Sequence, residues 1–112
     1  MQRYLSKYGE VQHMDKSIDS AIKKYAEAVK RYIPRSRIFL YGSYARGYSR
    51  ETSDIDIAVI VDKIDGNYLE MSARLVELIE GIDVRIEPLL LCESHDKSGF
   101  TESILNHGIL IS

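Results

Sequence analysis

Amphipathic and β-rich stretches alternate along this chain, and their order restricts the fold to a small sheet backed by helices. Apolar residues recur at helical spacing from Asp15 to Ile33, and Pro34 ends that helix. The predicted elements are a helix at 15–33, strands at 37–41 and 54–62, a helix at 67–80, a strand at 82–91 and a helix at 101–107. We therefore predict the α/β (α+β) class with a small mixed β-sheet.

The second helix, 67–80, is expected to bury one apolar stripe and to end at Gly81. The residues of that stripe are Leu69, Leu75, Val76, Leu78 and Ile79. Helix 101–107 is expected to pack Ile104 and Leu105 inward.

The length of 112 residues fits a single domain, 1–112, in which residues 1–14 form a lead-in of unknown role. A hydrophobic fraction of 45% and a charged fraction of 29% are typical of a globular protein with its own core. Apolar runs are too short to cross a bilayer, and the N-terminus has no signal-peptide pattern, so we expect a cytoplasmic protein with no membrane partner. The single cysteine, Cys92, excludes an internal disulfide.

The charge is unevenly distributed, although the net value is only −2. Residues 1–50 carry 11 basic and 4 acidic side chains, whereas residues 51–112 carry 4 basic and 13 acidic ones. The net charge excludes bulk attraction to nucleic acid. The asymmetry fits either a solvated basic helix or two opposite sides that meet around one charged ligand.

A glycine-containing loop follows the first strand, at Gly42-Ser43-Tyr44-Ala45-Arg46-Gly47. Gly42 would let the backbone approach a ligand, and Ser43 offers a hydroxyl and an amide to an anion. Arg46 could add positive charge, although a plain turn with a solvated arginine explains the same residues. Three tyrosines surround this loop, and one of them could stack on a base if it is not simply packed: Tyr41, Tyr44 and Tyr48.

Two carboxylates open the second strand at Asp54 and Asp56. Side chains alternate along a strand, so both point to one face and repel each other unless a cation lies between them. A divalent metal would supply that cation. The alternative is a solvated strand end, or pairing of Asp54 with Arg46 or Arg50.

The third strand repeats this pattern, with Asp83, Arg85 and Glu87 on one face. It could be an amphipathic edge strand with an internal Arg–Glu pair. Alternatively, Asp83 lies beside Asp54 and Asp56 and completes a magnesium site for one or two ions, with Glu87 as a reserve ligand.

Taken together, these motifs resemble the polymerase-beta-type nucleotidyltransferase superfamily. Gly42-Ser43, ten further residues and then Asp54-Ile55-Asp56 are similar to its signature, and the minimal nucleotidyltransferases (MNT proteins) carry the most similar version. Ile82 to Ile86 resembles the third-carboxylate strand, which places the third acid at Asp83. The resemblance covers roughly residues 15–110.

The resemblance implies a fold, a reaction and a partner. Gly42, Ser43 and Arg46 would bind the triphosphate of ATP, while Asp54, Asp56 and Asp83 would be the catalytic ligands of two Mg²⁺ ions. The enzyme would transfer AMP to a protein hydroxyl, such as a tyrosine of a HEPN-type toxin, and act as the MNT antitoxin of that toxin, similar to type VII systems.

Other functions fit the same residues. Larger members of the superfamily append a helical domain, for which these 112 residues have no room. Either a partner completes the site or another protein presents the acceptor, which favours protein modification over a small-molecule acceptor; the chain could also form an oligomer. The alternatives are a catalytically silent antitoxin that neutralises its partner by contact, and a nucleotidyltransferase that acts on a small molecule or an RNA end.

Overall fold

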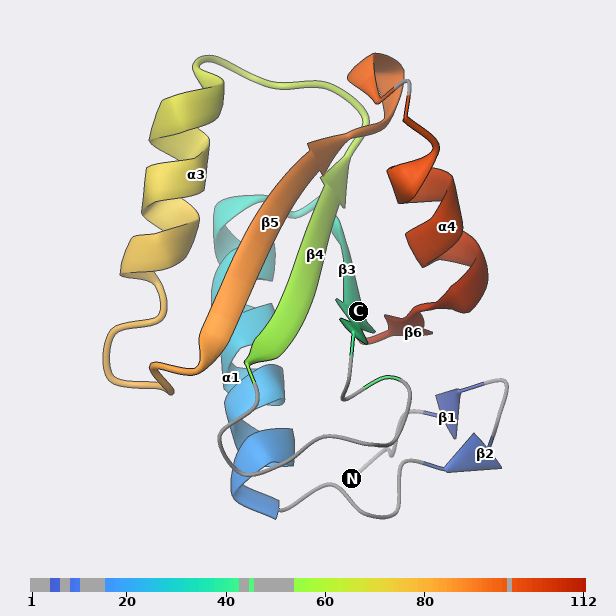
Figure 1. Cartoon of the computed structure of the whole chain (residues 1–112). Coiled ribbons are helices and arrows are strands. Elements are labelled where there is room, and N and C mark those ends of the chain that lie inside the picture. The colour runs from blue at the N-terminus through green and yellow to red at the C-terminus, as the bar shows by residue number, and fades with distance from the viewer. Residues whose placement is uncertain (1–4, 7–8, 11–15, 43–44, 46–53, 97) are drawn as a thin grey trace.

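A four-stranded mixed sheet with helices on both faces organises the chain (Figure 1). The computed structural model describes residues 5–6, 9–10, 16–42, 45, 54–96 and 98–112. Its helices are α1 (Lys16–Tyr32), α3 (Tyr68–Glu77), the short 3₁₀ helix η1 (Glu93–His95) and α4 (Phe100–His107). Its strands are β1 (Leu5–Ser6), β2 (Gly9–Glu10), β3 (Arg37–Tyr41), β4 (Ile55–Val61), β5 (Ile86–Cys92) and β6 (Ile109–Leu110). The predicted fold class is confirmed.

The strand order of the sheet is β5-β4-β3-β6. β3 runs antiparallel to both β4 and β6, whereas β4 and β5 are parallel and are connected through α3. β5 is an edge strand, and this position tolerates Pro88, which has no amide to donate. The lead-in contains a small antiparallel pair, β1 and β2, which lies near β6.

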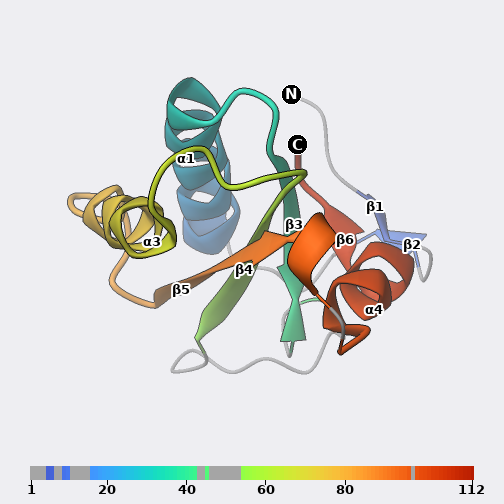
Figure 2. The ribbon, with the colours of Figure 1, turned by 90° about the horizontal axis from the view of Figure 1, so that it is seen from above.

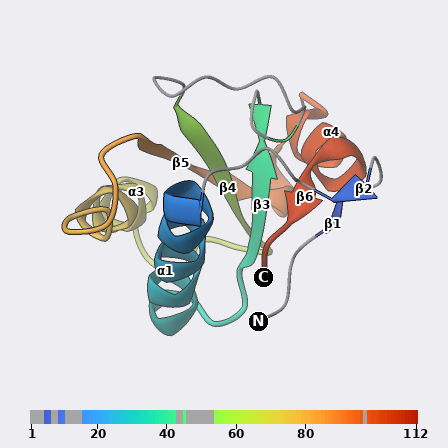
Figure 3. The ribbon, with the colours of Figure 1, turned by 90° about the horizontal axis from the view of Figure 1, so that it is seen from below.

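The larger core lies between the sheet and the helices α1 and α3, which share one face (Figures 2 and 3). Helix α1 buries the side chains at helical spacing, Ile18, Ile22, Tyr25 and Val29. The Tyr25 hydroxyl donates a 2.6 Å hydrogen bond to the backbone carbonyl of Leu75 in α3, so a buried polar group is satisfied between the two helices.

The opposite face of the sheet packs against α4. Phe39, Ala58 and Ile60 from the two central strands contact Ile104, which is buried as predicted. This smaller core leaves the neighbouring part of the same face, at the start of β4 and β5, available for polar residues.

The outer side of α1 is charged and exposed at Lys24, Glu27 and Arg31. Lys23 pairs with Asp19 one turn earlier, at 3.3 Å. These contacts favour a solvated helix face over convergence on one ligand as the explanation of the basic first half. None of the helices that the structure describes combines the length and the apolar character that a membrane crossing requires.

The predicted buried stripe of α3 is wrong at two positions. Leu69 and Val76 are 75% and 56% exposed, whereas Met71 and Leu75 are buried. The helix begins after Asn67, whose side chain accepts hydrogen bonds from the amides of residues 69 and 70. With this start, the face toward the sheet carries Met71 and Leu75, and Leu69 turns to the outside.

We expect Tyr25→Phe to lower the free energy of unfolding by about 1–2 kcal/mol, because it leaves the buried Leu75 carbonyl without its donor. Thermal denaturation followed by circular dichroism would measure the effect as a loss of several degrees. Tyr32→Phe is the matched control, since Tyr32 is 39% exposed and the substitution keeps its ring. Equal melting temperatures for the wild type and Tyr25→Phe would contradict this account of the core.

Candidate active site

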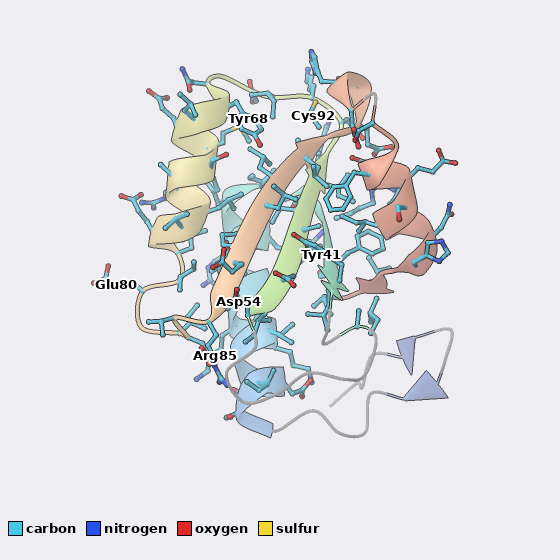
Figure 4. All side chains as sticks on the ribbon, viewed as in Figure 1. Tyr41, Asp54, Tyr68, Glu80, Arg85 and Cys92 are labelled. Atoms are coloured by element: carbon cyan, nitrogen blue, oxygen red, sulfur yellow. The ribbon has the colours of Figure 1, made fainter. Side chains whose placement is uncertain are left out.

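A row of three polar side chains crosses the sheet at the start of β4. Asp56 on β4 pairs in register with Tyr41 on β3 and with Glu87 on β5. Paired residues on neighbouring strands point to the same face, so these side chains lie on the face that α4 partly covers. Asp54 directly precedes β4 and is exposed. It lies two residues before Asp56, so alternation along the chain places both side chains on the same face. We call Asp54, Asp56 and Glu87 the carboxylate row. Figure 4 shows Asp54 and Tyr41 at this end of the sheet.

The carboxylates of the row repel one another. Burial raises the pKa of Asp56 above its usual value, and the negative charges of Asp54 and Glu87 raise it further. Burial also raises the pKa of Tyr41, with smaller contributions from Asp56 and Glu87. The Asp56 carboxylate therefore lies near two further negative charges, and a cation bound beside it would stabilise its charged form.

Gly42 directly follows Tyr41 and lies against the Asp56 carboxylate. Its φ of +75° is in the left-handed region, and a Cβ built at this position would overlap the carboxylate of Asp56. Only glycine meets both requirements without strain. The predicted close approach of the Gly42 backbone is thus present, and its nearest neighbour is a carboxylate of the row.

The predicted position of Asp83 on the third strand is wrong. β5 begins at Ile86, and Asp83 lies in the turn that precedes it. The Asp83 carboxylate accepts hydrogen bonds from the Arg85 amide at 2.9 Å and from the Arg85 guanidinium at 3.0 and 2.7 Å. Hydrogen bonding to Arg85 lowers the pKa of Asp83. Side-chain bonds of this kind stabilise turns in place of a strand ladder.

Glu87, the reserve ligand, occupies the register position that had been expected for Asp83. The two parallel strands align Ile55 with Ile86, which brings Glu87 next to Asp56. The sequence carries one signal for this pairing, because Ile86-Glu87 repeats the apolar-acidic order of Ile55-Asp56 in β4. The strand must begin at Ile86 for Glu87 to pair with Asp56. The alternation of apolar residues from Ile82 onward predicts an earlier start.

An aromatic pair continues the row beyond Tyr41. The rings of Tyr41 and Phe100, the first residue of α4, meet edge to face with centroids 5.8 Å apart and an interplanar angle of 86°. Phe100 is 41% exposed. No local pattern in the sequence indicates this contact, because Phe100 lies far from the glycine loop and reaches it only through the packing of α4.

Five candidate residues lie outside the described residues. They are Ser43 and Arg46, predicted to bind the triphosphate, Arg50, an alternative partner of Asp54, and Tyr44 and Tyr48, two of the three tyrosines near the loop. Their roles stay predictions.

The donor set suits a hard divalent cation, since Asp54, Asp56 and Glu87 offer carboxylate oxygens on one face. Within the described part of the chain, no three His, Cys, Asp or Glu side chains already form a metal-binding cluster. Burial and the negative charges of Asp54 and Glu87 raise the pKa of Asp56, and a bound cation would oppose these effects. The residues present therefore fit Mg²⁺ in their chemistry, and the ion would draw their oxygens together.

Known proteins resemble this chain in sequence and in fold. Residues 21–112 match the protein family described as Polymerase beta, Nucleotidyltransferase. Two proteins of Methanocaldococcus jannaschii, each described as a putative protein adenylyltransferase, are 45% identical over 53 residues and 41% identical over 66 residues. The matches cover 46% and 59% of this chain, and they span only 52% and 63% of those relatives.

Two solved structures share the fold. A putative nucleotidyltransferase from Sulfolobus solfataricus superposes with a TM-score of 0.58 at 24% identity, over 88% of this chain and 89% of that chain. A structure described as a putative minimal nucleotidyltransferase has a TM-score of 0.58 at 25% identity, over 89% of this chain and 99% of that chain.

Proposed function

Because the chain belongs to the polymerase beta nucleotidyltransferase family, we propose that it transfers AMP from ATP to a hydroxyl group of another protein. The observation that carries this proposal is the row of Asp56 and Glu87 in register, with the Gly42 backbone against Asp56. The descriptions of the two M. jannaschii relatives support a protein as the acceptor.

Asp54, Asp56 and Glu87 would hold Mg²⁺, which supplies Lewis-acid stabilisation of the charge on the phosphates. The Gly42 backbone lies against the Asp56 carboxylate, and we expect Ser43 and Arg46, which follow it in sequence, to bind the triphosphate.

The reaction needs an acceptor hydroxyl, a base and a leaving group. The hydroxyl oxygen of the acceptor attacks the α-phosphorus of ATP, and a new O–P bond forms while the bond to pyrophosphate breaks. The hydroxyl proton passes to a carboxylate of the row, for which Glu87 is our candidate because it is exposed beside Asp56. The products are the AMP-modified protein and pyrophosphate.

The third carboxylate is the part of the site on which sequence and structure differ, and paired variants test it. Glu87→Gln should lower transfer by at least about tenfold, because it removes a charge from the row beside Asp56. Asp83→Asn should leave transfer within a few-fold of wild type and weaken the turn held by Arg85. Transfer of labelled AMP from ATP would measure both. Loss with Asp83→Asn alone would restore Asp83 as the third acid.

Magnesium should stabilise the folded chain through the same row. Addition of Mg²⁺ without nucleotide is expected to raise the melting temperature by a few degrees, since a ligand that binds only the folded state shifts the folding equilibrium. Sodium chloride at equal ionic strength is the control for general screening. An equal shift with the sodium salt, or no shift with magnesium, would contradict metal binding at the row.

The partner that we propose is a HEPN-type toxin, and the chain would act as its antitoxin by modifying it. The descriptions of the two M. jannaschii relatives as putative protein adenylyltransferases support an acceptor that is itself a protein. Co-expression tests this role: growth rescued by the wild type and lost with Asp56→Asn, while the two proteins still bind, would support catalysis. Rescue by both would indicate neutralisation by contact.

A further inference from the structure

The Tyr41–Phe100 pair is positioned next to the carboxylate row on the same face of the sheet. Tyr41 is one strand away from Asp56, and its ring lies against that of Phe100 on α4. The Tyr41 side chain therefore lies between the Asp56 carboxylate and the ring of Phe100. Figure 4 shows Tyr41 beside β4, on the side where α4 lies.

Phe100 is held in a defined place although 41% of it is exposed. Its amide donates to the Ser98 hydroxyl at 3.2 Å, and the amide of Thr101 donates to the Asp96 carboxylate at 2.5 Å. Hydrogen bonds from Ser98 and Thr101 hold the pKa of Asp96 well below its usual range. These bonds secure the first turn of α4, and Tyr41 supports the ring from one side.

We propose that the exposed part of Phe100 is the stacking surface for the base of the bound nucleoside triphosphate, with Tyr41 as the residue that positions its ring. This proposal rests on the proposed nucleotidyltransferase function. In a nucleoside triphosphate, the ribose lies between the base and the α-phosphate. In the protein, the Tyr41 ring lies between Phe100 and the carboxylate row that would hold that phosphate.

A nucleobase suits this surface better than the acceptor does. Tyr41 leads directly into Gly42, the start of the predicted triphosphate loop, so the aromatic pair is attached to the nucleotide side of the site. Stacking on an aromatic face tolerates every base, so a single exposed ring provides affinity rather than base discrimination.

Isothermal titration calorimetry of the full chain with magnesium, using ATP and inorganic tripolyphosphate as separate ligands, tests the proposal. Wild type should bind ATP more tightly than tripolyphosphate, which has no base. Phe100→Ala should weaken ATP binding by about tenfold, the effect expected of one base stacked on an aromatic side chain, and leave tripolyphosphate binding unchanged. Phe100→Tyr should retain the affinity for ATP. Leu110→Ala, at another exposed apolar residue, is the control.

The outcomes separate this proposal from the one on which it rests. If wild type binds tripolyphosphate and ATP but Phe100→Ala binds ATP normally, the stacking surface is wrong and the nucleotidyltransferase function stands. Slower transfer to an acceptor with unchanged ATP binding would assign Phe100 to the acceptor and overturn the proposal. Equal weakening of both ligands would also overturn it, as a structural effect. Failure of wild type to bind either ligand would overturn both proposals.

Discussion

Asp56→Asn is expected to reduce AMP transfer by more than about a hundredfold while the chain stays folded. Asp56 is the centre of the carboxylate row, between Tyr41 and Glu87 in register and with Gly42 against its side chain. Asparagine keeps the shape of the side chain and removes the charge that a metal ion requires. Transfer of labelled AMP from ATP measures the loss.

The stability of the Asp56→Asn variant provides an independent check with a defined sign. The pKa of Asp56 in the folded chain is raised above its ordinary value of 3.8, so the folded state binds its proton more tightly than the unfolded state does. The stabilising contribution of the protonated form is therefore lost as the pH rises through the folded pKa. In the absence of metal, we expect the variant to be more stable than wild type at neutral pH. This difference should shrink as the pH falls through the raised pKa of the folded chain and should be lost below pH 3.8.

Asp62→Asn is the matched control for this experiment. Asp62 follows the other end of β4 and is exposed, so its loss should leave transfer unchanged. Equal activity of the Asp56→Asn variant and wild type would remove the row from the mechanism. A drop in stability at neutral pH would contradict the repulsion described above.

Gly42→Ala is expected to impair both folding and transfer. The positive φ at this position costs a residue with a Cβ about 1–2 kcal/mol, and the new Cβ would also displace the Asp56 carboxylate. We therefore predict a fall of several degrees in melting temperature, together with a loss of transfer approaching that of Asp56→Asn. Thermal denaturation and the AMP-transfer assay measure the two effects on the same preparation.

Gly81→Ala separates the two causes. Gly81 has a similar φ of +79°, but a Cβ there meets nothing within 4 Å. This variant should lose stability for the same backbone reason and retain full transfer activity. If Gly42→Ala kept its activity, the contact between residue 42 and Asp56 would be irrelevant to catalysis.

Much of the fold could be predicted because its elements have clear periodicity and clear ends. The strand 37–41 matches the observed β3, and α1 ends just before Pro34, as a proline predicts. The exposed Leu69 shows the limit of periodicity. Of the predicted stripe, Leu75 is buried and Leu78 and Ile79 are partly buried against the core, whereas Leu69 and Val76 are exposed, and Met71, outside the predicted stripe, is buried instead.

The parts of the candidate site that lie on a single strand could be predicted from the sequence. The parts that depend on strand pairing or on the packing of a helix could not. The same-face placement of Asp54 and Asp56 follows from alternation along a single strand. The placement of Glu87 rather than Asp83 beside Asp56 depends on the register between two strands and on the hydrogen bond between Arg85 and Asp83, and neither follows from alternation along one strand. Phe100 reaches the row only through the docking of α4.

The most direct test of the central claim is intact-mass spectrometry of the chain together with the proposed HEPN-type partner protein, co-expressed with it, after incubation with ATP and Mg²⁺. Wild type and Asp56→Asn are compared in parallel. Our account predicts that the partner gains mass in steps of one AMP with wild type only. No gain in mass, with the two proteins still tightly bound, would contradict it and indicate a chain that acts on its partner by contact alone.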